Sequence, residues 1–151
     1  MGSEMCIRDR LRAGLADGTI DIVATDHAPH PHEDKDCEWA AAAFGMLGLE
    51  TALSIVQETM VDPGLLDWAG VADRMSHAPA RIGRVADHGR PLAEGEPANV
   101  VLYDPGVRRV VDPTESASLS RNTPYRGMEL PGRVVATFLR GRATVLDGKV
   151  T

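Results

Sequence analysis

The chain has 151 residues, with 43% apolar and 25% charged side chains, and its 22 acidic and 16 basic residues give a net charge of −6. This composition is typical of a globular protein and excludes a disordered or fibrous chain. The acidic balance, with no cluster of Lys and Arg, argues against nucleic acid as a partner, and no apolar run approaches the roughly 18 residues of a membrane helix. Two cysteines and the lack of a signal-peptide core predict a cytoplasmic location.

The first quarter of the chain is predicted to contain the end of a helix and one short strand. Residues 1–10 show no helical or strand period and are interpreted as a leader or non-native segment. A helix is expected to end near Leu15, with its C-cap at residues 17–18, where glycine can adopt a positive φ. The β-branched run 20–24 predicts a strand that delivers Asp26 at its end.

Two helices are expected next. Apolar residues that recur every three or four positions predict an amphipathic helix over residues 46–60. A second helix is predicted over residues 67–76, because Asp67 is a good N-cap and an apolar face follows it. Pro79 is expected to limit this helix, since proline removes a backbone donor.

From about residue 99 onward the apolar period changes to two, which predicts β structure. Short strands and tight turns alternate here: strands 99–103, 107–111, 134–139 and 142–146, with turns at 104–106, 140–141 and 147–148. Residues 112–132 are polar and are read as a loop. Helices in the first part and strands in the last third predict an α/β chain.

Residues that can bind metal gather directly after the predicted strand. Asp26, His27, His30 and His32 lie within seven positions, and imidazole together with carboxylate suits zinc. A strand that ends on an aspartate is also how an α/β barrel presents a catalytic group. The alternative is a solvated turn that Asp26 caps, and the spacing alone leaves both interpretations open.

The string Thr25-Asp26-His27-Ala28-Pro29-His30 resembles the motif that closes the metal-dependent barrel of dihydroorotases, in the cyclic amidohydrolase superfamily. Segments along residues 11–150 resemble the same family in order: 17–21, 44–51, 95–99, 122–125 and 139–142. The resemblance implies the C-terminal part of a metal-dependent (β/α)8 barrel in residues 11–90, with its last strand and the following helices. Residues 91–151 would form the C-terminal part of a small flanking β-domain.

The resemblance also implies a role for four residues. Asp26 would be a zinc ligand and the catalytic acid–base, and His30 would bind the carboxylate of the substrate. Phe44 and Gly45 would contact the pyrimidine ring through backbone groups, whereas His27 is read as a packing or supporting residue. The implied reaction is the zinc-dependent, reversible cyclisation of N-carbamoyl-L-aspartate to dihydroorotate in pyrimidine biosynthesis, with one or two zinc ions.

The family's remaining metal ligands have no counterparts in the chain, so the 151 residues alone are expected to be inactive. Two alternative functions stay open: another cyclic amidase (hydantoinase, dihydropyrimidinase or allantoinase), or a non-catalytic subunit that scaffolds aspartate carbamoyltransferase. His30 favours a substrate that carries a carboxylate, and the intact Asp26 argues against a scaffold. A homodimer and an association with aspartate carbamoyltransferase are further expectations from the resemblance.

Two near-motifs are interpreted as structural. His30-Pro31-His32 imitates the His-x-His zinc motif, which the family carries at its first barrel strand. Ser76 and His77 could suggest a nucleophile and its base, but adjacent side chains on a helix point apart. The segment 77–80, His-Ala-Pro-Ala, departs from the Asn-Pro-Ala that family members usually have.

Overall fold

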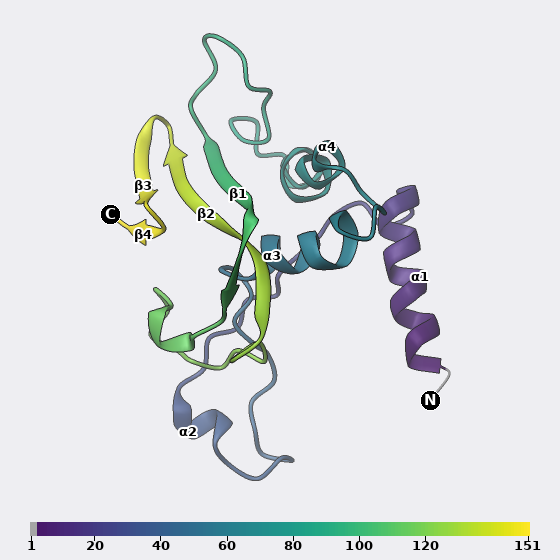
Figure 1. Cartoon of the computed structure of the whole chain (residues 1–151), viewed down its shortest axis with the longest axis vertical. Helices are drawn as coiled ribbons and strands as arrows, with labels where there is room; N and C mark the ends of the chain where they lie inside the picture. The colour runs from purple at the N-terminus through teal and green to yellow at the C-terminus, as the bar shows by residue number, and fades with distance from the viewer. Residues whose placement is uncertain (1–2) are drawn as a thin grey trace.

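The computed structural model describes residues 3–151 and places helices in the first part of the chain and one antiparallel sheet in the last third (Figure 1). The helical segments are α1 (Ser3–Asp17), α2 (His32–Lys35), α3 (Ala52–Val56), α4 (Trp68–Ala72) and α5 (Ala78–Ile82), with the π-helical segments η1 (Gln57–Val61) and η2 (Asp73–His77) and the 3-10 turn η3 (Pro113–Glu115). The strands are β1 (Val100–Val110), β2 (Glu129–Leu139), β3 (Arg142–Leu146) and β4 (Lys149–Val150). No helix in the described part of the chain is long and apolar enough to cross a membrane.

The sheet has the order β1-β2-β3-β4, and its two predicted C-terminal turns are confirmed. Arg140 and Gly141 both have positive φ, 52° and 80°, where β2 turns into β3. Asp147 and Gly148, at 50° and 75°, repeat this geometry before β4. Two successive residues with positive φ match the right-handed twist of adjacent strands, which explains these short connections.

The predicted turn at residues 104–106 is wrong, because β1 runs through it as one strand. Its register against β2 moves from Asp104 opposite Arg133 to Arg108 opposite Pro131, so β1 carries extra residues here. These residues form a bulge, which a paired strand accommodates by a local bend. The predicted loop 112–132 also ends early, since β2 begins at Glu129.

The predicted helix 67–76 is confirmed and is longer than expected. The Asp67 carboxylate accepts a hydrogen bond of 2.7 Å from the Gly70 amide, as an N-cap does. The helical run α4-η2-α5 then continues through Pro79 to Ile82. Pro79 is tolerated because the π-helical segment before it shifts the hydrogen bonds and leaves the proline in the first turn of α5, where no amide partner is needed.

The predicted helix 46–60 begins six residues late, at Ala52, and ends at Val61. Met46 is held in an extended conformation by a parallel bridge to His27. Gly48 lies so close to the preceding segment that an added Cβ would stand 2.9 Å from the Thr25 carbonyl oxygen. These tertiary contacts override the helical spacing at the start of the segment.

Residues 3–10 belong to α1, so the expectation that they lack regular structure is wrong; Met1 and Gly2 lie outside the described residues. The helix escaped detection because Ile7 and Leu11 are 60% and 56% exposed, and an unpacked helix needs no apolar stripe. Its last turn does pack, since Leu15 contacts the core. The interpretation of residues 1–10 as a leader or non-native segment stays a prediction.

The predicted strand 20–24 forms no ladder with another segment of the described chain, so its assignment as a strand is wrong. The Val23 amide donates to the Arg74 carbonyl at 3.1 Å, and the Ala28 amide donates to the Met46 carbonyl at 2.9 Å. A strand needs a neighbouring backbone along its whole length. Among residues 3–151 no second strand lies beside this segment.

The main apolar cluster lies between the helices. Its buried members are Val56, Met60 and Val71, and the partly buried residues packed on them include Leu15 and Val23. The segment that leads to Asp26 is therefore anchored on the same core as α3 and α4. In Figure 1, α3 and α4 stand between the sheet and α1.

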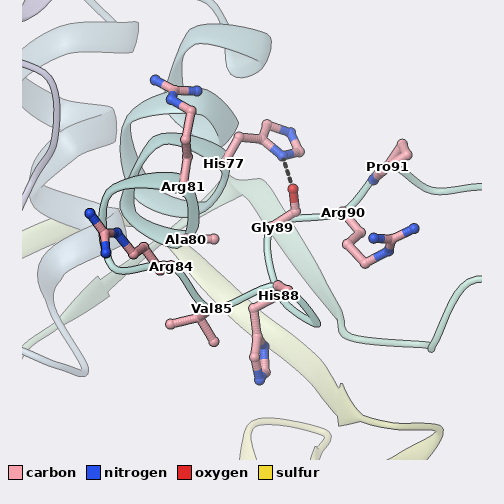
Figure 2. Close-up of a pocket in the computed structure, with 10 residues that line it drawn as sticks. His77, Ala80, Arg81, Arg84, Val85, His88, Gly89, Arg90 and Pro91 are labelled. Carbon is pink, nitrogen blue, oxygen red and sulfur yellow. Dashed lines mark hydrogen bonds between the residues drawn. The ribbon is translucent and has the colours of Figure 1, made fainter.

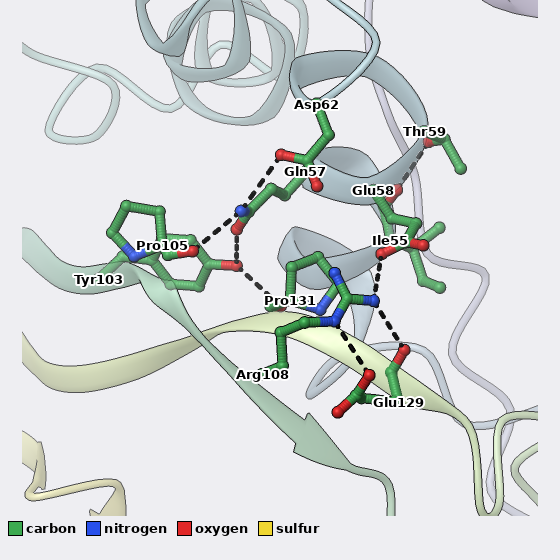
Figure 3. A network of polar contacts seen from close by, with 10 residues as sticks. All are labelled: Ile55, Gln57, Glu58, Thr59, Asp62, Tyr103, Pro105, Arg108, Glu129 and Pro131. Atoms are coloured by element: carbon green, nitrogen blue, oxygen red, sulfur yellow. Dashed lines mark hydrogen bonds and ion pairs between the residues drawn. The ribbon is translucent and has the colours of Figure 1, made fainter.

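A polar network around the buried Gln57 joins the helices to the sheet (Figure 3). Gln57 is 5% exposed, accepts a hydrogen bond of 2.7 Å from the Tyr103 hydroxyl, and donates one of 3.1 Å to the Pro105 carbonyl. Arg108 on β1 adds ion pairs of 3.2 Å to Glu58 and to Glu129. The bulge in β1 thus brings Tyr103 and Pro105 to the one buried glutamine of η1.

Burial raises the pKa of the Tyr103 hydroxyl above its ordinary value of 10.0. Between the unfolded and folded pKa values, the folded protein keeps a proton that the unfolded chain has lost. The stabilisation by neutral Tyr103 is therefore complete below about pH 10 and is lost as the pH rises through the folded pKa. Above pH 10 we expect the melting temperature to fall less steeply for Tyr103→Phe than for the unaltered protein. Tyr125→Phe, which removes the other tyrosine, is the control, and equal slopes for unaltered protein and Tyr103→Phe would contradict this prediction.

Candidate functional site

Asp26 follows the segment 20–24 and has a left-handed backbone, φ 46°. Aspartate is among the few residues that adopt this conformation with modest strain. Its side chain is exposed, and no hydrogen bond or ion pair to its carboxylate is found within residues 3–151. The carboxylate is therefore available to bind a ligand or to accept a proton.

His27 joins the Asp26 segment to the next loop. Its Nδ1 accepts hydrogen bonds from the amides of Gly48 at 3.0 Å and Leu49 at 3.4 Å. Two donors at Nδ1 require the imidazole to be unprotonated there, which leaves Nε2 to carry the proton of the neutral ring. His27 is thus a supporting residue, which agrees with its interpretation from the sequence.

The structure brings His30 and Gly45 together. Gly45 has φ 104°, and a Cβ added to it would lie 2.5 Å from the Ala28 Cβ and 3.7 Å from Nε2 of His30. Only glycine permits this approach, because it lacks the Cβ and accepts a positive φ. The other imidazole nitrogen of His30, Nδ1, lies 4.0 Å from the Asp34 carboxylate.

Phe44 and Asp26 take no part in the contact between His30 and Gly45. The Phe44 side chain is 96% exposed, and no hydrogen bond or ion pair in the described part of the chain links Asp26 with Phe44, His30 or Gly45. The backbone around Phe44 is nevertheless held, because Lys35 Nζ donates to the Ala43 carbonyl at 2.6 Å and to the Gly45 carbonyl at 3.0 Å. Sequence reasoning missed this lysine, which stands in a charged run.

Asn122 bonds to two loops of the candidate site, and the sequence analysis gave it no role. Its side chain lies between the loop of His30 and the loop of Gly45 and bonds to the backbone of both. The resemblance covers residues 122–125 as a motif, but no local pattern assigns a role to an asparagine more than 90 positions from His30.

The donor set for a metal is incomplete within this chain. Asp26 offers one carboxylate, and within residues 3–151 no three His, Cys, Asp or Glu side chains form a group that could hold a metal ion. A protein zinc site takes three or four protein ligands. Asp26 fits the role of one such ligand and no more.

Two cavities lie elsewhere on the molecule. One, of about 530 Å³, is lined by His77, Arg81, Arg84 and Arg90, whose side chains diverge rather than converge on one point (Figure 2). His77 Nδ1 lies 2.7 Å from the Gly89 carbonyl and fixes that loop, which supports the structural interpretation of Ser76-His77. The other cavity, of about 1440 Å³, lies between the α4–α5 run and the ends of β1 and β2. Neither cavity includes a predicted site residue.

Comparison with known proteins places the chain among cyclic amidohydrolases. It is 74% identical over 93% of its length to a dihydroorotase of Streptomyces coelicolor, and 56% identical over 93% to one of Mycobacterium tuberculosis. Among solved structures, the L-hydantoinase (dihydropyrimidinase) of Arthrobacter aurescens superposes with a TM-score of 0.85 at 33% identity over 94% of the chain. No family model matches the chain.

The chain spans about a third of the length of these relatives: 33% of both dihydroorotases and 32% of the hydantoinase. These matches confirm the predicted fold class, a C-terminal α/β part of an amidohydrolase barrel with part of a flanking β-domain. The names of the relatives agree with the resemblance carried by residues 25–30. The chain belongs to the dihydroorotase family.

Proposed function

We propose that the whole protein containing this chain is a dihydroorotase, which interconverts N-carbamoyl-L-aspartate and dihydroorotate. The observation that carries the proposal is the 56–74% identity to dihydroorotases over 93–94% of the chain. The activity belongs to the whole protein, because the chain supplies only one of the metal ligands. The boundary we propose, barrel in residues 11–90 and β-domain in residues 91–151, is supported by the change from helices to strands between Ile82 and Val100.

Asp26 is proposed as both a zinc ligand and the acid–base of the reaction. Zinc, once bound, would supply Lewis-acid chemistry that polarises the amide carbonyl and makes a water more acidic. In the hydrolytic direction, the Asp26 carboxylate accepts the proton of the attacking water and then gives it to the ring nitrogen as the carbon–nitrogen bond breaks. Its exposure and its lack of internal partners suit a group that must hold and release one proton.

His30 is proposed to bind the carboxylate of the substrate. A histidine can donate a charge-assisted hydrogen bond to a carboxylate. Its Nε2 stands beside Gly45, where the exposed backbone of residues 44–45 can meet the ring of the same substrate. The cytoplasmic location, the homodimer and the association with aspartate carbamoyltransferase remain predictions.

The proposal is tested by His30→Ala in the whole protein. We expect KM for dihydroorotate to rise about tenfold or more with a smaller change in kcat, because a charged hydrogen bond made in the ground state is lost. His32→Ala, two positions further on at the start of α2, is the matched control and should leave KM unchanged, since His32 is exposed and its ion pair is with Asp36.

Substrates that lack the carboxylate separate the alternatives. If dihydrouracil or hydantoin had a higher kcat/KM than dihydroorotate, this result would favour the cyclic amidase and contradict the proposal. A folded, zinc-loaded protein without turnover of any of the three rings would favour the scaffold.

A further inference from the structure

We propose that Asn122 is a positioning residue of the substrate site, which sets the loop of His30 against the loop of Gly45. The inference rests on the proposed function, because it assigns Asn122 a part in binding the same substrate. Asn122 lies between η3 and β2, in the sheet half of the chain, whereas both loops belong to the half that precedes α3. It acts through the backbone of other residues, since each hydrogen bond of its side chain in the described part of the chain goes to a backbone atom.

The Asn122 side chain uses both ends of its amide. Its Nδ2 donates to the Ala28 carbonyl at 2.8 Å and to the Gly45 carbonyl at 3.4 Å, while its Oδ1 accepts from the His30 amide at 3.3 Å. The Asn122 backbone carbonyl adds a fourth bond, from the Leu47 amide at 3.1 Å. One half-buried residue thus bonds on both sides of Pro29 and on both sides of Met46.

These bonds hold His30 close to the Gly45 backbone, and we infer that this approach is needed to bind the substrate. His30 Nε2 and the Gly45 backbone approach closely only while Ala28 stays against Gly45, and the Asn122 amide group spans that contact. Lys35 and His27 hold the Gly45 loop from other sides but do not bond to the His30 backbone. We therefore infer that loss of the Asn122 side chain frees His30 more than it disturbs Asp26, to which no bond of Asn122 runs.

The first test is steady-state kinetics of the whole protein with dihydroorotate. Asn122→Ala should raise KM about tenfold and change kcat less than about threefold, because hydrogen bonds that orient the binding loops are lost while Asp26 is untouched. Asn122→Asp keeps an acceptor for the His30 amide but sets a carboxylate against the Ala28 and Gly45 carbonyls, so its KM should be at least as high. A normal KM in Asn122→Asp would overturn the inference, since the donor bonds would then be dispensable.

Asn99→Ala is the matched control. Asn99 also joins two backbone segments, donating to the Asp87 carbonyl at 2.9 Å and accepting from the Arg140 amide at 2.8 Å, and neither bond involves a residue of the proposed site. It should lower the melting temperature to a similar extent and leave KM unchanged. Equal rises of KM in Asn99→Ala and Asn122→Ala would reduce the role of Asn122 to general stability and overturn the inference.

A double mutant tests whether Asn122 affects substrate binding through His30 or independently of it. In the His30→Ala background, Asn122→Ala should add at most about threefold to KM, because two changes that act through one group are not additive. A full tenfold effect in both backgrounds would overturn the inference.

Hydrogen exchange of the whole protein tests the anchoring without any substrate. The amide of His30, which bonds to the Asn122 side chain, should exchange faster in Asn122→Ala and at the normal rate in Asn99→Ala. Faster exchange with an unchanged KM overturns the inference and leaves the proposed function standing. An unaltered protein that never turns over dihydroorotate overturns the proposed function itself, and with it the role in substrate binding.

Discussion

Asp26→Asn in the whole protein should lower kcat for dihydroorotate by about a hundredfold or more, the range that general acid–base catalysis contributes. The amide of asparagine cannot accept the proton of the attacking water or return it to the ring nitrogen. The fold should survive, because asparagine also adopts a positive φ and the Asp26 carboxylate has no hydrogen-bond or ion-pair partner among residues 3–151. A melting temperature within a few degrees of normal is therefore expected beside the loss of rate.

Asp21→Asn is the control for this prediction. Asp21 is an exposed aspartate in the segment that leads to Asp26, and its replacement removes the same charge five positions away. It should leave both kcat and the melting temperature unchanged. If Asp26→Asn kept more than a tenth of the normal kcat at full zinc occupancy, Asp26 would not be the acid–base.

Gly132→Ala should have the largest effect on stability. Gly132 lies within β2 at φ 75°, and an added Cβ would overlap the hydroxyl oxygen and the adjoining ring carbon of Tyr103. A left-handed backbone costs a non-glycine residue about 1–2 kcal/mol, and overpacking of a filled site adds about 1–3 kcal/mol. Tyr103 cannot move aside without breaking its bond to Gln57, which is buried. We expect a loss of about 3 kcal/mol or more in the free energy of unfolding.

Gly127→Ala separates the cost of the left-handed backbone from the cost of the overlap with Tyr103. Gly127 has nearly the same φ, 74°, but no atom lies within 4 Å of an added Cβ. Urea unfolding of the whole protein should show a loss of only about 1–2 kcal/mol for this variant, the cost of backbone strain alone. Equal losses in the two variants would mean that the contact between Gly132 and Tyr103 is not what makes glycine necessary in β2.

The elements that the sequence determined by itself are those whose hydrogen bonds join residues only a few positions apart. Asp67 caps α4 through a bond to Gly70, three positions away, and the turn at Arg140-Gly141 needs only two positive φ angles between alternating strands. The roles proposed for Asp26 and His30 likewise rest on one short string, residues 25–30, and these roles stay predictions.

Partners far along the chain decided the rest. Pro105 reads as a turn residue, yet it lies within β1 because β2 bonds to both sides of its bulge. Residues 20–24 have the composition of a strand but form no ladder, since a strand exists only beside another backbone. Asn122 shows the same limit at the site: its bonds to Ala28 and His30 cross more than 90 residues. A pattern of a few neighbouring residues carries no information about a contact between residues so far apart in the sequence. Only the tertiary structure brings Asn122 to the two loops.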